Sequence, residues 1–314
     1  MVETRFTRLV GCSVPVQQAP MGPISPPGLA LAVAGAGGLG TLHALHSATD
    51  VEEACKALPQ DADGALAVNV LLPILRPDML EAAANLARVV DFFWGPPDPA
   101  LVEIAHQGGA LACWQVGSIE NARAAGAAGC DLVVAQGIEA GGHHDGRSEL
   151  MPLLEACLSE LEVPVLASGG IATAADVERV LRAGADGVRI GTRFIATDES
   201  GAHPLYRQAL IDAGPDEGIE TDLFSVGCPL CPSNHGVLRS SVELATARAG
   251  QMVAAVGSNE VPAFAGTPPV SWARGEITAM AMYAGRGVGS VDKVQPAAVV
   301  VAELAAGAER ALRP

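Results

Sequence analysis

The residue best placed to do chemistry in this sequence is a histidine that directly follows two glycines. Residues 136–143 read Gln-Gly-Ile-Glu-Ala-Gly-Gly-His and continue an apolar run at residues 131–135. Glycines let the backbone come close to a ligand and adopt positive φ, and an imidazole can move a proton near neutral pH. We therefore expect His143 to act as a general base. The alternative is a structural histidine bonded to a loop carbonyl.

Two glycine turns further along the chain have the composition of a phosphate site. Residues 165–171 read Val-Leu-Ala-Ser-Gly-Gly-Ile, and residues 188–194 read Val-Arg-Ile-Gly-Thr-Arg-Phe. The loops after strands seven and eight of a barrel commonly bind phosphate. We expect the amides of Gly169 and Gly170 to face the phosphate from one side, and Gly191 and Thr192 to close the site from the other. Two ordinary turns would be the alternative.

Amide side chains end several of the apolar runs. Gln17, Asn69, Gln115 and Gln136 each lie where a buried strand is expected to stop. Buried polar groups need hydrogen-bond partners, and a flat heterocycle with ring N–H and C=O groups would supply them. Bonds to neighbouring loops are the alternative for each residue taken alone.

Several side chains near these motifs receive lesser expectations. Glu139 is expected to organise its loop, and His144 to face solvent or the rim of the site. Thr173 is expected to cap the helix after the first glycine turn. Arg193 points either to the phosphate or to a surface carboxylate, and both alternatives stay open.

The segment Cys228-Pro-Leu-Cys231, followed by His235, has three residues of the kinds that bind zinc. No second cysteine pair follows it, and a redox disulfide is expected in a strand–helix setting that this loop lacks. No further ligands stand near His143 in the sequence either. We therefore expect no metal, and interpret Cys228 and Cys231 as two loop thiols.

Short apolar runs alternate with alanine-rich helical segments, which is typical of a (β/α)₈ TIM barrel, an α/β fold. Most of the runs are continuously apolar, as strands buried on both faces are. Eight strands are predicted, at residues 14–19, 38–42, 65–70, 89–94, 110–115, 131–136, 163–168 and 187–190.

The alternation stops after residue 190. Helical patterns at residues 205–213 and 238–250 flank a loop rich in proline and cysteine, which predicts a second, smaller, mainly helical domain. The sequence thus divides into a barrel, residues 1–200 plus 286–314, and a small substrate or lid domain, residues 201–285. A last helix is expected within residues 295–312.

Composition excludes several classes of partner. The 314 residues carry a formal net charge of −16 and only two lysines. Nucleic-acid binding proteins carry basic patches, and an anionic membrane surface would repel this chain, so we expect neither partner. The seven cysteines are scattered, as reduced thiols are in the cytoplasm. Residues 1–8 lack the apolar core of a signal peptide, so we expect a soluble cytoplasmic protein.

Taken together, the motifs resemble those of the nitronate monooxygenases, over about residues 14–304. The most specific block is Glu139-Ala-Gly-Gly-His143. The others are Ala19-Pro-Met21, residues 36–40, Asn69, Ser168-Gly-Gly-Ile171, Gly191-Thr-Arg-Phe194 and Tyr283-Ala-Gly285. His144 stands where the family usually has arginine, and the Cys228–Cys231 segment is unusual, which puts the substrate in doubt.

This resemblance implies an FMN-binding barrel without a metal, which oxidises alkyl nitronates with O₂ to a carbonyl compound and nitrite. It implies that His143 is the catalytic base. The residues that it places at the FMN are Ala19, Pro20, Met21, Asn69, Gln115, Gln136, Gly141, Gly142, Ser168, Gly169, Gly170, Gly191 and Thr192.

Two other functions stay open at this point. One is an FMN-dependent NAD(P)H:quinone or enoyl-thioester reductase on the same barrel, which would use the same phosphate site without a base. The other is a barrel that holds a phosphorylated ligand without catalysis. The sequence leaves the physiological substrate undetermined, and a homodimer is left open.

Overall fold

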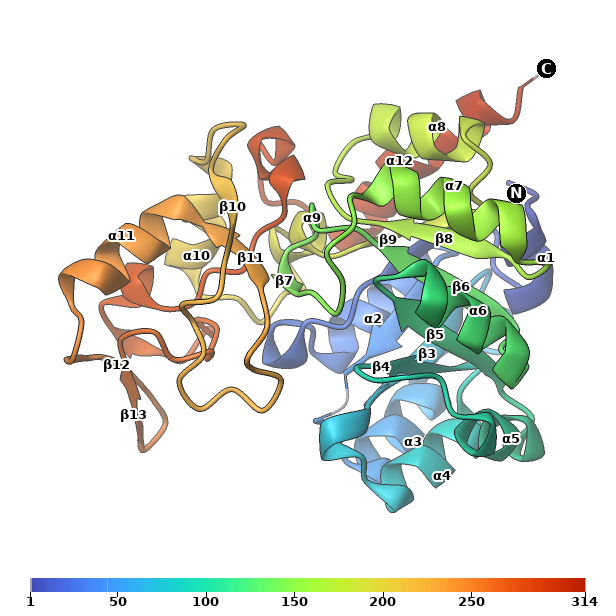
Figure 1. Cartoon of the computed structure of the whole chain (residues 1–314), viewed down its shortest axis with the longest axis horizontal. Helices are drawn as coiled ribbons and strands as arrows, with labels where there is room; N and C mark the ends of the chain where they lie inside the picture. The colour runs from blue at the N-terminus through green and yellow to red at the C-terminus, as the bar shows by residue number, and fades with distance from the viewer. Residues whose placement is uncertain (1, 44, 314) are drawn as a thin grey trace.

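The computed structural model describes residues 2–43 and 45–313, and its main feature is a closed barrel of eight parallel strands (Figure 1). Neighbouring strands follow one another in the sequence, and the last pairs with the first through Gln17 and Arg189. The strands are β1 (Val16–Gln18), β2 (Leu39–Leu42), β3 (Ala65–Leu71), β4 (Val89–Phe93), β5 (Leu111–Val116), β6 (Leu132–Gln136), β8 (Val165–Ser168) and β9 (Gly187–Ile190). All eight predicted strands, and with them the TIM barrel, are confirmed.

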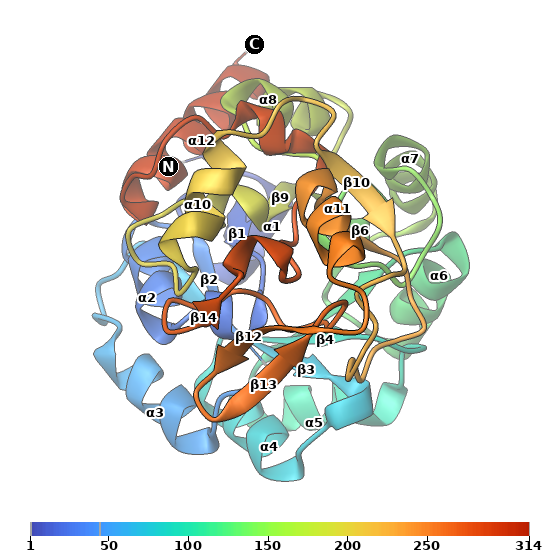
Figure 2. The same ribbon diagram turned by 90° about the vertical axis from the view of Figure 1, so that its left-hand side faces the viewer.

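Helices surround the barrel and cover the outer faces of the strands, as the view along the barrel shows (Figure 2). The runs of alanine and small apolar residues on these helices pack closely against the strands in one large hydrophobic cluster. The helices are α2 (Pro27–Gly35), α3 (Ala48–Ala57), α4 (Pro77–Leu86), α5 (Pro99–Gly108), α6 (Ile119–Ala128), α7 (Leu150–Glu160), α8 (Ala174–Arg182) and α12 (Ala297–Ala311). The predicted last helix is α12, which packs against α8 and α2.

A short N-terminal helix, α1 (Arg5–Val10), was not predicted from the sequence. Thr4 caps it, and its side chain accepts a hydrogen bond from the Thr7 amide at 3.1 Å. Phe6 is completely buried and belongs to a cluster with the inward-facing Leu39 and Leu132. The helix therefore closes the end of the barrel opposite the site described below, where stability rather than chemistry is expected.

The chain leaves the barrel after β9 and the short helix α9 (Thr192–Ile195), and forms a smaller unit beside the open end (Figures 1 and 2). This unit contains α10 (Pro204–Ile211), α11 (Arg239–Ala247) and a 3₁₀ turn at Ile277–Ala279, and a further 3₁₀ turn at Arg286–Ser290 follows it where the chain returns to the barrel. The strands of the unit are β10 (Gly218–Thr221), β11 (His235–Leu238), β12 (Met252–Val256), β13 (Asn259–Pro262) and β14 (Arg274–Gly275). Its own apolar cluster includes Tyr206, Leu238 and Met280.

These five strands contain 19 residues and the two α-helices 17, so the expectation of a mainly helical unit is wrong. Each strand spans only two to five residues, and β10 and β13 mix charged and apolar side chains. Such strands lack the continuous apolar runs by which buried strands are recognised in a sequence. In the described part of the chain, no helix has the length and apolar character needed to cross a bilayer.

Candidate active site at the open end of the barrel

A cavity of about 330 Å³ lies at the carboxyl ends of the barrel strands. This is the end at which barrel enzymes bind their substrates. Of the residues expected at a cofactor or at the reaction, all but Gln17 lie on its wall, although they come from seven separate segments. The residues on the wall are Ala19, Pro20, Met21, Asn69, Gln115, Gln136, Gly141, Gly142, His143, Ser168, Gly169, Gly170, Gly191 and Thr192. Gln17 is completely buried below the cavity, where its amide bonds to Thr41 and Arg189 instead of a ligand.

The turn after β8 exposes backbone amides because two glycines take conformations that side chains disfavour. Gly169 and Gly170 have φ values of +125° and +67°. A Cβ atom on Gly170 would stand 3.1 Å from the Cβ of Glu139. Within the described residues, neither glycine amide donates to a backbone carbonyl. The turn can therefore offer N–H groups to an anion.

Hydrogen bonds fix the end of this turn where it leads into α8. Thr173 caps α8 by accepting the Asp176 amide at 3.2 Å, which confirms its predicted role. The Asp176 carboxylate in turn accepts the amides of Ala172 and Thr173. The Thr192 hydroxyl accepts the Gly285 amide at 3.0 Å, which ties the second glycine turn to the far end of the smaller unit.

Gln136 ends β6 with one half of its amide bonded and the other half free. Its Nε2 donates to the carbonyl of His143 at 3.1 Å. Its Oε1 is buried and has no partner among the described residues. A buried acceptor without a donor is costly, so this oxygen is suited to an N–H group of a ligand.

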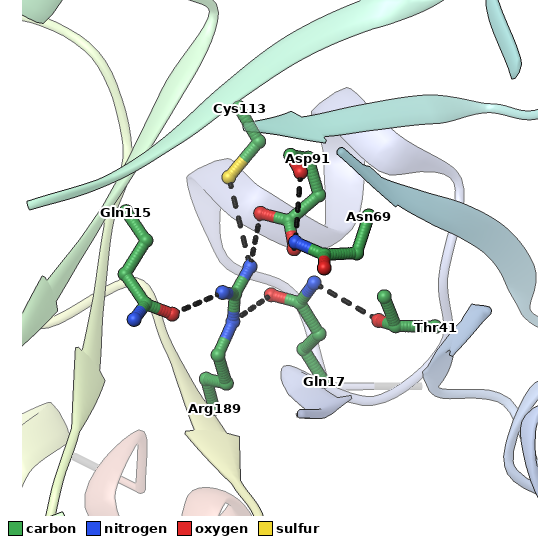
Figure 3. A network of polar contacts seen from close by, with 7 residues as sticks. All are labelled: Gln17, Thr41, Asn69, Asp91, Cys113, Gln115 and Arg189. Carbon is green, nitrogen blue, oxygen red and sulfur yellow. Dashed lines mark hydrogen bonds and ion pairs between the residues drawn. The ribbon is translucent and has the colours of Figure 1, made fainter. Parts of the chain in front are cut away.

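The other strand-end amides are engaged in a network inside the barrel (Figure 3). Arg189 is its centre, and its guanidinium donates to Gln17 Oε1 at 3.1 Å and to Gln115 Oε1 at 2.5 Å. Arg189 Nη2 also lies 2.5 Å from Asp91 Oδ1, and both side chains are buried. Asn69 Nδ2 donates to the Asp91 carbonyl at 3.0 Å. Neighbouring groups within the barrel thus satisfy part of the hydrogen-bonding capacity of the Asn69 and Gln115 side chains.

This ion pair was missed in the sequence. Arg189 lines the cavity and places a positive charge on its wall. The available signal was a charged residue inside each of two apolar strands, since Asp91 and Arg189 interrupt β4 and β9. Charges are rarely buried unless they are paired.

His143 stands on the short strand β7 (Gly142–His143), which connects the barrel to the smaller unit. β7 pairs with β11, so that His143 lies opposite His235 and Gly142 opposite Gly236. The imidazole of His143 packs against the rings of Trp94, His235 and Tyr283, at centroid separations of 6.0, 5.2 and 5.4 Å.

Burial is the main cause that lowers the pKa of His143 to about 4, and the neighbouring His235 and His144 lower it further. The imidazole is therefore neutral at pH 7 and can accept a proton.

The contacts of the loop after β6 decide the expectations for Glu139 and His144. Glu139 organises the loop as expected, because its carboxylate accepts the amide of Leu150 at the start of α7. His144 neither faces solvent nor lines the cavity. It is 5% exposed, and its Nε2 lies 2.7 Å from the carbonyl of Ala140. The solvent-facing expectation missed the pairing of the preceding residue with β11, which covers this side chain.

Arg193 points away from the cavity. Its Nη2 lies 3.3 Å from Glu303 Oε2 on α12, so the structure supports the carboxylate alternative. His43 received no role from the sequence, yet it lines the cavity. Burial, more than the neighbouring His46, lowers the pKa of His43 to about 3, so it is also neutral at pH 7.

The loop with the two cysteines lies against His143 rather than apart from it. Cys228 Sγ is 3.2 Å from His143 Nε2, and Cys231 Sγ is 3.7 Å from the same nitrogen. Sequence spacing could not reveal this, because 85 residues separate His143 from Cys228. Burial raises the pKa of Cys228 to about 11, so this thiol is protonated at pH 7.

Comparison with known proteins agrees with this geometry. The family model described as "Nitronate monooxygenase" matches residues 3–88 and 78–307. A nitronate monooxygenase of Pseudomonas aeruginosa is 33% identical, over 66% of this chain and 73% of that protein. A Bacillus subtilis relative described as a probable nitronate monooxygenase is 31% identical, over 70% of this chain and 76% of that protein.

Solved structures show the same fold over nearly the whole chain. A single-residue mutant of FabK from Thermotoga maritima has a TM-score of 0.78 and 26% identity, and the match covers 99% of this chain and 97% of that chain. A nitroalkane oxidase of Streptomyces ansochromogenes has a TM-score of 0.75 and 27% identity, and the match covers 98% of this chain and 99% of that chain.

Proposed function

The chain belongs to the nitronate monooxygenase family of oxidoreductases, and we propose that it is an FMN-dependent enzyme that oxidises alkyl nitronates with O₂ to a carbonyl compound and nitrite. One observation carries the proposal. A single cavity gathers the glycine turns, the free Gln136 acceptor and a neutral histidine at the open end of the barrel.

The residues of the cavity fit FMN. The amides of Gly169 and Gly170 would face its phosphate, with Gly191 and Thr192 opposite them, and backbone dipoles would attract the anion although the chain is acidic. Gln136 Oε1 would accept an N–H group of the flavin ring. The remaining contacts on the wall of the cavity come from Ala19, Pro20, Met21, Asn69, Gln115, Gly141, Gly142 and Ser168.

Bound FMN supplies the electron transfer from substrate to O₂. The chain supplies a base and a shaped, mostly apolar pocket. His143 takes the α-proton of a neutral nitroalkane on its imidazole, which leaves a nitronate in the cavity. Burial keeps this imidazole neutral at pH 7, so it is ready to accept the proton. A positioned base accelerates such a step by about 10²–10⁴-fold.

We propose a two-domain division on the same basis. Residues 1–200 plus 286–314 form the FMN-binding barrel, and residues 201–285 form a small substrate domain. The support is that Pro229, Leu230 and Tyr283 line the cavity from the side of the smaller unit. This domain would therefore set which nitronates fit.

The test is the absorption spectrum of the purified protein, followed under anaerobic conditions. We expect a flavin spectrum that an alkyl nitronate bleaches and that NADH and NADPH leave unchanged. Rapid bleaching by a nicotinamide nucleotide, with no response to the nitronate, would contradict the proposal and favour the reductase. Failure of the protein to retain added FMN would also contradict it.

A further inference from the structure

Four side chains with metal-binding chemistry meet beside the cavity, two from the loop at residues 227–236, one from β11 and one from β7. Both thiols approach the same atom, His143 Nε2, with Cys228 Sγ at 3.2 Å and Cys231 Sγ at 3.7 Å. Donor atoms of His143, Cys231 and His235 all lie within 4.8 Å of one another. β-Strand pairing fixes the two histidines, because His143 and His235 are directly opposed.

His235 adds an independent observation. It is completely buried, and its Nδ1 has no hydrogen-bond partner among the described residues. Its Nε2 accepts the amide of Phe224 at 3.1 Å, which holds the ring in place. A fully buried imidazole with incomplete hydrogen bonding is unusual in a protein interior. Because Nε2 accepts this bond, a metal that takes the lone pair of the neutral His235 ring replaces the Phe224 contact at Nε2.

We propose that Cys228, Cys231, His143 and His235 form a binding site for one divalent transition metal of the zinc class. Tetrahedral zinc with Zn–S bonds of about 2.3 Å and Zn–N bonds of about 2.1 Å places sulfur and nitrogen about 3.6 Å apart. The two observed sulfur–nitrogen distances, 3.2 and 3.7 Å, lie on either side of this value. These two distances match tetrahedral ligation around His143, whereas the donor atoms of Cys231 and His235, within 4.8 Å, must move closer together to bind one ion.

The donor set also selects the metal. Thiolate and imidazole ligands favour zinc and its neighbours over magnesium or calcium, which prefer oxygen. Two thiolates balance the charge of a divalent ion, and the two imidazoles add none. No metal was expected from the sequence, because the ligands were counted along the chain, whereas the structure joins ligands from two distant segments.

The site shares His143 with the proposed reaction, so the two uses exclude each other. A metal on Nε2 holds the imidazole and blocks access of the base to a nitroalkane. Metal binding itself does not depend on the proposed function, because it can be measured without turnover and with or without flavin. Failure of one proposal therefore does not imply failure of the other.

The first experiment titrates Co²⁺ into the full-length protein, with its thiols kept reduced by a phosphine. We expect tetrahedral cobalt bands at wavelengths longer than the flavin absorbs, and saturation at one Co²⁺ per chain. Zn²⁺ should displace the cobalt and abolish the bands. Absence of these bands in reduced, folded protein would overturn the proposal.

Cys231→Ser and His235→Asn are the variants that test the assignment, with Cys55→Ser as the matched control. Cys55 is another half-buried free cysteine, and it lies on α3. Removing one of the four ligands should weaken Zn²⁺ binding by on the order of 100-fold or more, whereas Cys55→Ser should bind as the wild type does. Equal affinity in Cys231→Ser and the wild type would overturn the proposal.

A measurement on the wild type keeps the test valid if these variants do not fold. Cysteine alkylation, located by mass spectrometry, is compared with and without Zn²⁺. We expect Zn²⁺ to protect Cys228 and Cys231 and to leave Cys55 reactive. Alkylation of all three at unchanged rates would overturn the proposal.

Discussion

The chemistry of His143 depends on a side chain that is buried and yet lines a cavity. Its neighbours are two other histidines, two thiols and two aromatic rings, and the described contacts include no carboxylate that would favour its protonated form. Desolvation therefore dominates, and the imidazole stays neutral well below pH 6.5. This state has a direct kinetic consequence.

The activity on a neutral nitroalkane should hold at mildly acidic pH. His143 is active as a base only when neutral, and its pKa is lowered to about 4. Therefore kcat/KM should stay high at pH 6 and fall only as the pH drops through about 4. The measurement is a pH profile of kcat/KM, with activity re-assayed at neutral pH to exclude unfolding. Half-loss near pH 6.5 would show an ordinary solvated histidine instead.

His143→Asn separates proton removal from the later oxidation. The variant lacks the base, so its kcat/KM for a neutral nitroalkane should fall by about 10²–10⁴-fold. A preformed nitronate needs no base and should lose far less. The check is a steady-state comparison of both substrates in the wild type and the variant. Equal losses on the two substrates would mean that His143 holds structure or ligand.

For single residues, the sequence identified the site residues that stand in glycine motifs, but it did not identify the side chains that contact them. All predicted site residues except Gln17 lie on one cavity, because they follow strands whose carboxyl ends must meet. The contact between Cys228 and His143 was not predictable, since it depends on how the smaller unit pairs with β7. The roles assigned to the site residues stay predictions.

Among the elements, the turn between β8 and α8 matters most for cofactor binding. Its geometry needs glycine at two successive positions with positive φ. The Thr173 and Asp176 side chains fix its exit into α8. A substitution in this turn should therefore weaken cofactor binding more than it lowers the stability of the fold.

Gly170→Ala should weaken FMN binding by on the order of 10-fold, since left-handed backbone costs about 1–2 kcal/mol for a residue with Cβ. The new methyl group would also stand 3.1 Å from the Cβ of Glu139. Gly11→Ala is the matched control, with a φ of +84° and open space around it at the end of α1. Fluorescence titration of FMN measures both. Wild-type affinity in Gly170→Ala, or an equal loss in Gly11→Ala, would contradict this role.

The elements themselves were predicted to different extents. The eight barrel strands were found because they are continuous apolar runs between helices. The strands of the smaller unit were not, because β7 and β14 have two residues each and β10 is only partly buried. Tertiary pairing, rather than local sequence, decides their conformation.

On the scale of the whole molecule, the barrel is held together across its interior by the Arg189 network (Figure 3). The guanidinium joins β9 to β1, β4 and β5 through Gln17, Asp91 and Gln115. These contacts connect residues up to 172 positions apart. The network therefore links the cavity wall to the closure of the barrel.

Asp91→Asn should destabilise the fold strongly, by about 3–5 kcal/mol, because it leaves the buried Arg189 without its counter-charge. Glu160→Gln is the control, because its bridge to Arg123 lies at the surface, where solvent screens the pair and it contributes little to stability. Denaturant unfolding of both variants gives the comparison. Similar small effects in the two would show that the buried pair is not needed for stability.

The barrel was predictable from alternation and length, and a small domain at its open end was expected, whereas the side chains that this domain places on the cavity wall were not. The domain places Pro229, Leu230 and Tyr283 on the cavity wall, where they limit the substrate. These residues come from segments with no recognisable periodicity.

The most direct test of the proposed function is nitrite release by the FMN-loaded protein from a simple alkyl nitronate in air. We predict that nitrite and the carbonyl compound appear in equal amounts, that O₂ is consumed with them, and that protein without FMN produces neither. A flavin-loaded protein that consumes no O₂ and releases no nitrite from any alkyl nitronate offered would contradict the proposed function.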